Sequence, residues 1–171
     1  MIETLYSFDF DGTLCFSPEP NTGKEVWKEK TGTDWVYNGW WGKAETLDTE
    51  VFFVPKSEWV YKHYLKAKSE DNSYTIMATG RLEKVENMRK NVEAILRSHN
   101  MSFDEVHLNT LGDTFRFKIK LFERLINKTE CKHFIMYDDR YNHIVKFREW
   151  AKEQSIPVTI IDVKNKTEKQ F

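Results

Sequence analysis

The sequence predicts an α/β fold: a five-stranded parallel sheet flanked by helices, with a small cap inserted after the first strand. Short apolar runs alternate with longer helix-patterned stretches, which is typical of parallel sheets with right-handed crossovers. The chain of 171 residues is the size of one domain that can bury most of its apolar side chains. The interval between the first two apolar runs, residues 10–73, is longer than one crossover needs, and the surplus predicts the cap.

Each element has its own signal. The first strand, about residues 4–9, is a short apolar run. An irregular stretch over 15–56, punctuated by prolines and glycines, is unusually aromatic and is expected to form the cap. Apolar stripes at helical spacing and apolar runs then alternate. They predict helix 57–68, strand 74–78, helix 84–99, strand 105–108, helix 115–126, strand 133–137, helix 142–154 and strand 157–162. Residues 164–171 are expected to be a polar, frayed tail of the single domain 1–171.

Bulk composition narrows the function only slightly. With 26 Lys and Arg against 27 Asp and Glu, the net charge of −1 predicts no overall attraction to nucleic acid, although a local basic groove stays possible. Cys15 and Cys131 have no metal-ligand spacing and are expected to be reduced thiols of a cytoplasmic protein. No basic leader or long apolar run is present, so neither a signal peptide nor a membrane span is expected.

The most informative segment joins the first strand to two aspartates. Asp9 and Asp11 stand in an Asp-x-Asp pattern that Gly12 and Thr13 follow at once. A strand that ends in carboxylates and a glycine turn places them where open α/β sheets build their sites. Two carboxylates this close repel each other, so a divalent cation with oxygen ligands is the natural partner.

Three later segments complete a pattern. An apolar run ends in Thr79-Gly80-Arg81, Lys118 lies near the start of a predicted helix, and a further apolar run ends in Asp138-Asp139-Arg140. Of the two lysines in that helix, Lys118 falls in its apolar arc and Lys120 falls opposite, at 100° per residue. An ammonium that faces the sheet needs a carboxylate or phosphate partner, so Lys118 is the candidate site residue and Lys120 a solvated charge.

In this order the segments resemble the four motifs of the haloacid dehalogenase (HAD) superfamily, over about residues 6–143. Further features are similar to the HAD domain of Swiss Army knife RNA-repair proteins. They are Ser17-Pro18-Glu19-Pro20, Gly39-Trp40-Trp41, Thr79-Gly80-Arg81 and Tyr137-Asp138-Asp139-Arg140 with His143. The resemblance implies a HAD-like Rossmannoid fold in which the first strand lies between the second and fourth.

The resemblance also implies roles. Asp9 would be the nucleophile and form an aspartyl-phosphate, and Asp11 would act as general acid and base. Mg²⁺ would be held by an Asp9 oxygen, the Asp11 backbone carbonyl and a carboxylate of Asp138 or Asp139. Thr79 would hydrogen-bond the phosphoryl group, and Lys118 would pair with both Asp9 and the phosphate.

The substrate-binding residues are less sharply defined by the sequence. Gly80, Arg81 and Arg140 are candidates for substrate binding. The two arginines could clamp a second phosphate or form surface ion pairs. His143 could touch substrate or be a surface residue at a helix start. Trp40 and Trp41 could stack on a base or form the core of the cap, and the resemblance favours the stacking interpretation.

Three functions are therefore open. The first is a Mg²⁺-dependent phosphatase that removes terminal phosphates from nucleic acid. The second is a phosphatase for nucleotides or other small phosphorylated metabolites. The third is a catalytically silent binding protein on the HAD scaffold, against which the presence of Asp11 argues because a binder does not need it.

Overall fold

In the computed structural model, which describes residues 1–171, six strands form one sheet in the order β3-β2-β1-β4-β5-β6. The strands are β1 (Thr4–Phe8), β2 (Ser73–Leu82), β3 (Glu105–Asn109), β4 (His133–Asp138), β5 (Val158–Asp162) and β6 (Thr167–Gln170). β1 to β5 are parallel, and β6 is antiparallel to β5 at the edge of the sheet. The predicted α/β class and the central place of β1 are confirmed.

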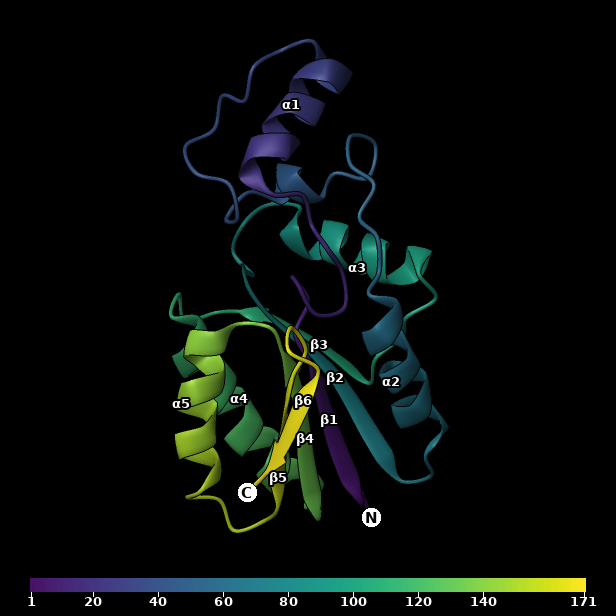
Figure 1. Ribbon diagram of the computed structural model, residues 1–171, viewed down its shortest axis with the longest axis vertical. Coiled ribbons are helices and arrows are strands. Elements are labelled where there is room, and N and C mark those ends of the chain that lie inside the picture. Colours follow the sequence, from purple (N-terminus) through teal and green to yellow (C-terminus); the bar gives the residue numbers. More distant parts are fainter.

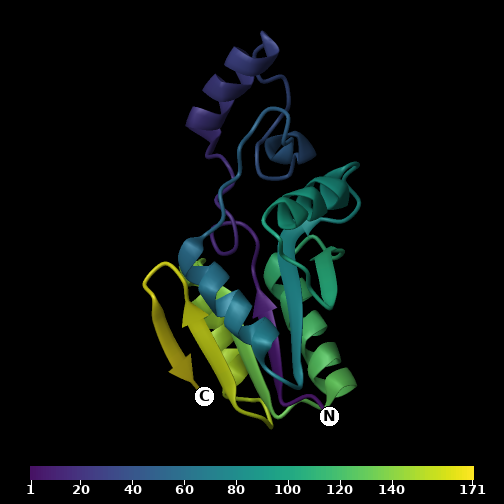
Figure 2. The same ribbon diagram turned by 90° about the vertical axis from the view of Figure 1, so that its right-hand side faces the viewer.

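Helices cover both faces of the sheet (Figures 1 and 2). α2 (Glu58–Ser69) and α3 (Met88–Ser98) share a core with Tyr6 and Phe8, whereas α4 (Thr114–Thr129) and α5 (Tyr141–Ala151) share the other with Leu5. Successive residues of a strand point to opposite faces, so β1 contributes to both cores in turn. A strand buried on both faces reads as the continuous apolar run that the sequence displays.

The register of the three central strands brings the motifs together. Phe8 pairs with Met77 of β2 on one side and with Tyr137 of β4 on the other. The residues just after these pairs therefore emerge at one edge of the sheet. Open parallel sheets bind ligands at the carboxyl ends of their strands.

Residues 164–171 differ from the prediction. They are not a frayed tail, because Thr167–Gln170 pairs with β5 and makes the sheet six-stranded rather than five-stranded. All four residues are polar and exposed. A solvated edge strand has no apolar alternation, so the periodicity that predicts buried strands could not detect it.

The segment 15–56 projects beyond the carboxyl end of the sheet (Figure 1), and we call it the cap. Its ends lie side by side, since the Phe16 amide donates to the Pro55 carbonyl (2.9 Å). The prediction of an irregular stretch is wrong for α1 (Pro20–Thr31) and for the short 3₁₀ helix η1 (Ala44–Leu47). Pro20 occupies the first turn of α1 and Gly32 (φ +76°) ends it, so the two residues that indicated a loop delimit a helix instead.

Two further boundaries differ by four residues. β2 extends to Leu82, so Thr79, Gly80 and Arg81 belong to the strand, whose pairing with β3 is irregular there. α3 begins at Met88 rather than at residue 84, because Asn87 before it has a left-handed backbone (φ +62°) that interrupts the helical pattern.

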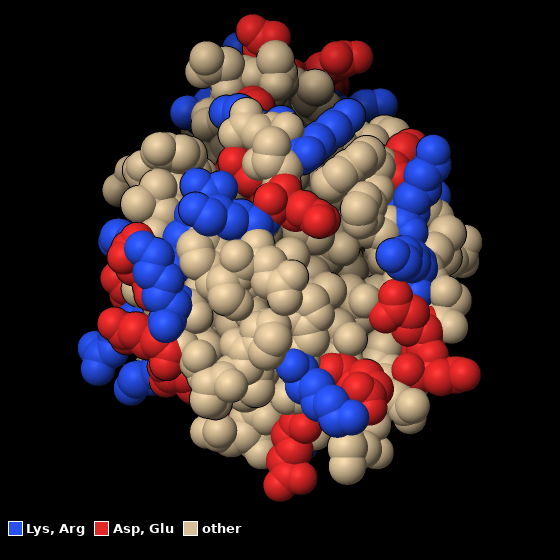
Figure 3. All heavy atoms as spheres, turned by 60° about the horizontal axis from the view of Figure 1, so that its bottom comes forward, with Lys and Arg blue, Asp and Glu red and all other residues tan.

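The surface and the helices add two observations. Figure 3 shows lysines and arginines next to aspartates and glutamates around the rim of one face, with no large area of a single sign. None of the helices combines the length and the apolar character that a membrane span requires.

Candidate active site

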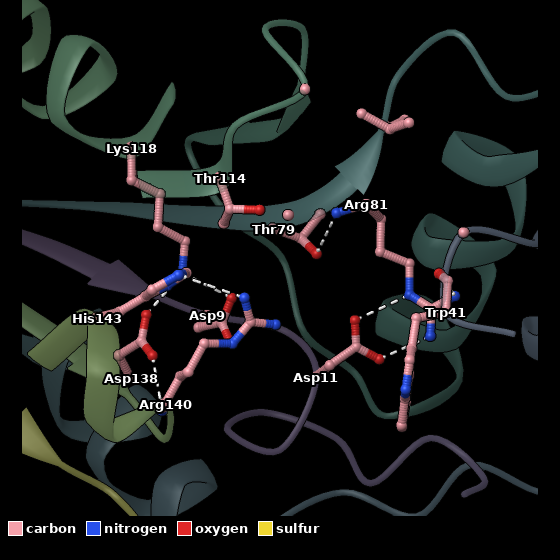
Figure 4. Close-up of a pocket in the computed structure, with 14 residues that line it drawn as sticks. Asp9, Asp11, Trp41, Thr79, Arg81, Thr114, Lys118, Asp138, Arg140 and His143 are labelled. Atoms are coloured by element: carbon pink, nitrogen blue, oxygen red, sulfur yellow. Dashed lines mark hydrogen bonds and ion pairs between the residues drawn. The ribbon is translucent and has the colours of Figure 1, made fainter. Parts of the chain in front are cut away.

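The base of the site is an ion-paired triad at the carboxyl end of the sheet. The Lys118 ammonium donates to Asp9 Oδ1 (2.8 Å) and to Asp138 Oδ2 (2.7 Å). Asp9 follows β1, Asp138 ends β4, and Lys118 lies in the second turn of α4. Figure 4 shows the lysine reaching down to both carboxylates. The structure therefore joins three of the four sequence segments through one side chain.

The helical-face argument for the lysine can be compared with the structure directly. The Lys118 side chain is only 3% exposed, whereas Lys120 is exposed. Burial alone would lower the pKa of Lys118, but Asp138 and Asp9 outweigh it and raise the pKa. Lys118 is therefore a fixed positive charge at the base of the site.

A third carboxylate joins this group. One oxygen each of Asp9, Asp138 and Asp139 lie within 4.8 Å of one another. A Cβ on Gly12 (φ +73°) would overlap the Asp139 carboxylate, so glycine is required for this approach. Three carboxylates face one lysine, and oxygen-rich groups of this kind suit a hard divalent cation. The donor set fits Mg²⁺, with Asp138 and Asp139 both within reach.

Burial and the neighbouring negative charges raise the pKa values of two of these carboxyl groups. Burial raises the pKa of Asp9 to about 7 although Lys118 opposes the shift, and Asp138 adds to it. Burial and the charge of Asp138 raise the pKa of Asp139 to about 6. A bound cation would stabilise the ionised forms and lower both pKa values.

Asp11 points away from this triad. Both of its carboxylate oxygens accept hydrogen bonds from Arg81, through Nε and Nη2 at 2.8 Å each, and Ser17 donates to Oδ1. Figure 4 shows the pair on the opposite side of the pocket from Lys118. The expected contribution of Asp11 to metal binding was its backbone carbonyl, and that stays a prediction.

Arg81 differs from the expectation of a phosphate clamp or a surface ion pair. It is buried, and its Nη1 donates to the Trp41 carbonyl (2.9 Å) and to Thr46 Oγ1 (2.8 Å) of the cap. Nε and one N–H of Nη2 are on Asp11, so four of its five N–H donors are already used by the protein itself. In this arrangement Arg81 connects Asp11 to the cap, and a bidentate clamp on a second phosphate would require it to release Asp11.

A cavity of about 290 Å³ lies above the triad, and only two of the residues that line it are apolar. Thr79 and Gly80 of β2 form one wall. Thr114 of α4 faces Gly80, where a Cβ would come 2.7 Å from Thr114 Oγ1. Thr114 was missed by sequence reasoning. The signal was available, because it lies one helical turn before Lys118, at the end of α4 that faces the site.

The two neighbouring tryptophans separate in the structure. Trp40 is 5% exposed, packs against Trp35 (4.5 Å between ring centroids) and donates its indole N–H to the Pro18 carbonyl (2.7 Å). It belongs to the core of the cap, so the expectation of substrate contact is wrong for Trp40. Trp41 is 45% exposed and lines the cavity, where a stacking role stays possible in geometry.

Arg140 and His143 line the cavity at the start of α5. The Arg140 backbone amide donates to Asp138 Oδ1 (2.9 Å), and its guanidinium donates to His143 Nε2 (3.3 Å). Burial and the neighbouring guanidinium lower the pKa of His143 to about 4, so the ring is neutral at pH 7. The side chain of Arg140 has no carboxylate partner, which leaves its charge facing the cavity.

Comparisons with known proteins give a family. A family model described as HAD domain family 1 in Swiss Army Knife RNA repair proteins matches residues 17–169. The matched range contains Thr79, Lys118 and Asp138 but begins after Asp9 and Asp11. The placement of these two aspartates therefore rests on the structure, which brings Asp9 to Lys118. No curated protein matches the chain.

Two solved structures have a similar fold. One is described as the structure of the Pnkp1/Rnl/Hen1 RNA repair complex, at 19% identity over 92% of this chain and 42% of that one (TM-score 0.57). The other, described as the structure of the Pnkp1/Rnl/Hen1 complex, is 16% identical over 92% of this chain and 45% of that one (TM-score 0.58). The chain thus spans less than half the length of the chains that it matches.

Proposed function

Because the chain belongs to HAD domain family 1 of Swiss Army Knife RNA repair proteins, we propose that it is a Mg²⁺-dependent phosphatase for terminal phosphates of nucleic acid. The observation that carries the proposal is the bridge from Lys118 to Asp9 and Asp138 at the floor of a polar cavity. A phosphomonoester requires a nucleophile, an acid for the leaving oxygen and positive charge on the phosphoryl group. Each requirement has a residue at this site.

Asp9 supplies the nucleophile. One carboxylate oxygen forms a bond to phosphorus while the bond from phosphorus to the leaving oxygen breaks, which yields an aspartyl-phosphate and an alcohol. Lys118 offsets the charge of the phosphoryl oxygens and holds the Asp9 carboxylate in place. Thr79 donates its hydroxyl to a phosphoryl oxygen from the wall of the cavity.

Asp11 supplies the proton transfer. It protonates the leaving oxygen and then takes a proton from the water that hydrolyses the aspartyl-phosphate. In the structure both Asp11 oxygens are bound by Arg81, so the carboxyl group exchanges this partner for the substrate during the cycle. Because Arg81 also holds Trp41 and Thr46, this exchange is linked to the position of the cap.

The carboxylates that would hold Mg²⁺ are those of Asp9 and of Asp138 or Asp139, with the Asp11 carbonyl. When bound, the ion neutralises charge on the phosphoryl oxygens and on the carboxylates. The alternative of a silent binding protein is disfavoured because such a protein has no use for a buried lysine between two aspartates.

The size of the cavity supports a second candidate function. At about 290 Å³ it is at the small end of ligand pockets, which suits one phosphate with its sugar, and small phosphorylated metabolites would fit equally. The two functions differ in what lies outside the cavity. Trp41 at the rim and the free charge of Arg140 favour a substrate with a base or a second phosphate.

Phosphate release from a panel of substrates tests the proposal. The panel consists of single-stranded oligonucleotides with a 3′- or a 5′-phosphate, the corresponding mononucleotides and a small aryl phosphate, each with Mg²⁺. We expect a higher kcat/KM for one class of oligonucleotide end than for its mononucleotide. Asp9→Asn is the control for contaminating phosphatases. A preference for mononucleotides would favour the second candidate, and binding without any release would favour the silent one.

A further inference from the structure

A row of cations runs along one exposed face of α4. Four basic residues follow one another at intervals of four: Arg116, Lys120, Arg124 and Lys128. Residues four apart in a helix lie on the same face, one turn above the other. The row starts in the first turn of α4, two residues after Thr114 of the cavity, and leads away from Thr114 along the helix.

Three of these four charges are free. Lys128 pairs with Glu105 (2.6 Å), whereas Arg116, Lys120 and Arg124 take part in no ion pair. Glu123 lies beside the row, but its carboxylate accepts a hydrogen bond from Trp150 Nε1 of α5 (3.2 Å). Like charges four residues apart on a helix repel each other and slightly destabilise it. A row of unpaired cations is therefore a small cost that an anionic ligand would remove.

Beside this row lies a groove of about 480 Å³, lined by Lys120 and Arg124 of α4 and by residues of β3 and the following loop. Arg89 and Glu83 also line the groove, but they pair with each other (2.7 Å), and Glu93 pairs with Arg89 as well (3.0 Å). The free positive charge of the groove thus comes from α4.

The groove and the active-site cavity share one loop. Thr110 and Leu111 line the groove, whereas Gly112, the next residue, and Thr114, the first residue of α4, line the cavity. Leu111 is 47% exposed, so an apolar side chain stands where the two meet. A ligand that fills the cavity and continues past this loop would reach the row of cations directly.

We propose that the groove and the exposed face of α4 bind the phosphodiester backbone of a single-stranded nucleic acid whose terminal phosphate occupies the cavity. The inference rests on the proposed function and deepens it, because it separates a polynucleotide from a nucleotide. Four residues of helix rise about 6 Å, a spacing that successive phosphates of an extended strand can match. A localised row of this kind is compatible with a net charge of −1 for the whole chain.

The test compares Lys120→Ala/Arg124→Ala with the matched pair Lys62→Ala/Lys66→Ala. Lys62 and Lys66 are also exposed and four apart, but they lie on α2. For the α4 pair, we expect the ratio of oligonucleotide to aryl phosphate kcat/KM to fall about tenfold or more. The salt dependence of the oligonucleotide reaction should flatten by about 1.4 log units per log unit, since each phosphate contact to a single strand contributes about 0.7. The α2 pair should behave as wild type. An unchanged ratio and slope in the α4 pair would overturn the proposal.

A binding measurement separates this proposal from the phosphatase activity itself. Fluorescence anisotropy of a labelled single-stranded decamer is followed with Asp9→Asn protein, with and without the α4 substitutions. Salt-sensitive binding that the α4 substitutions weaken supports the groove even if no substrate is hydrolysed. If the wild-type protein releases phosphate but the α4 substitutions leave binding unchanged, the groove proposal is refuted and the phosphatase proposal is not. Equal binding of poly-glutamate through the same residues would identify a surface for acidic proteins and overturn the nucleic-acid inference.

Discussion

The base of the active site and the cap differ in what holds them together. The base is ionic: Lys118 joins Asp9 and Asp138 at the ends of two paired strands. The cap is aromatic: Trp35 packs against Trp40 with their rings tilted by 48°, and Gly23 is needed where the Trp40 ring approaches α1. The sheet register dictates where the charges of the base lie, whereas aromatic packing and the hydrogen bonds of Arg81 position the cap.

We therefore expect the base and the cap to have different roles. The base has the carboxylates and the lysine that the proposed phosphoryl transfer uses, below a cavity that suits one phosphate with its sugar. The cap provides Trp41, and through Arg81 it also holds Asp11. Changes at the base should therefore affect all substrates alike, and changes at the surface of the cap should alter the choice among them.

Removal of the metal should have the largest effect, because it acts on the base as a whole. We expect phosphatase activity to disappear in excess EDTA and to return when Mg²⁺ is added back, since Asp9, Asp138 and Asp139 repel one another. Phosphate release is measured with an aryl phosphate and with an oligonucleotide. Full turnover of either in excess chelator would contradict the account of the base.

Lys118→Ala should come next. Loss of one electrostatic contact in a dry site costs about 3 kcal/mol of transition-state stabilisation, or about a hundredfold in rate. Lys120→Ala removes the same charge from the exposed face of α4 and is the matched control. With the aryl phosphate as substrate, Lys120→Ala should lose far less activity than Lys118→Ala. Equal losses in the two variants would show that the buried position of Lys118 does not matter.

Within the cap, Trp40 and Trp41 should differ in whether they affect stability or the choice of substrate. Trp40→Ala should lower the free energy of unfolding by about 3–5 kcal/mol, because it leaves a cavity in a packed core. Trp41→Ala should leave stability nearly unchanged and weaken turnover of oligonucleotides relative to the aryl phosphate, since stacking is worth roughly 1–3 kcal/mol per base.

Thermal unfolding and the ratio of the two activities are measured for both variants. If Trp41→Ala leaves that ratio unchanged, the rim of the cap does not select nucleic acid, and the small-metabolite function gains support.

The smallest expected effect is the pH dependence of the stability of the metal-free protein. Burial raises the pKa of Asp9 to about 7 and that of Asp139 to about 6, above the unfolded values near 4. The folded state then binds these protons more tightly, so their stabilising effect is complete below about pH 4 and is lost as the pH rises to about 7. In chelator, the melting temperature should fall by a few degrees over this range. Mg²⁺ at pH 7 should raise it again, and Asp9→Asn should flatten the profile. A melting temperature that rises with pH in chelator would contradict the account.

The sequence predicted the base better than the cap for a physical reason. Asp9 and Asp138 lie at the ends of apolar strands, and Lys118 lies on the apolar face of a helix, so each signal is local. The parallel sheet then brings these residues together at one end. The cap gave no such signal, because Pro20 and Gly32 serve equally in loops and at helix ends.

The neighbours Trp40 and Trp41 could not be told apart until their surroundings were known. The partners of Arg81 could not be identified either, since Asp11 and Thr46 are distant from it in the chain.

Asp9→Asn tests the central claim most directly, namely that Asp9 is the nucleophile of a phosphatase whose base Lys118 organises. The substitution keeps the size of the side chain and a hydrogen-bond acceptor for Lys118, and it removes the attacking carboxylate. Initial rates of phosphate release from the aryl phosphate with Mg²⁺ are compared with wild type, in protein shown by thermal unfolding to be folded. The account predicts a rate no higher than the background without enzyme. Turnover within about tenfold of wild type, a barrier change of only about 1.4 kcal/mol, would contradict it.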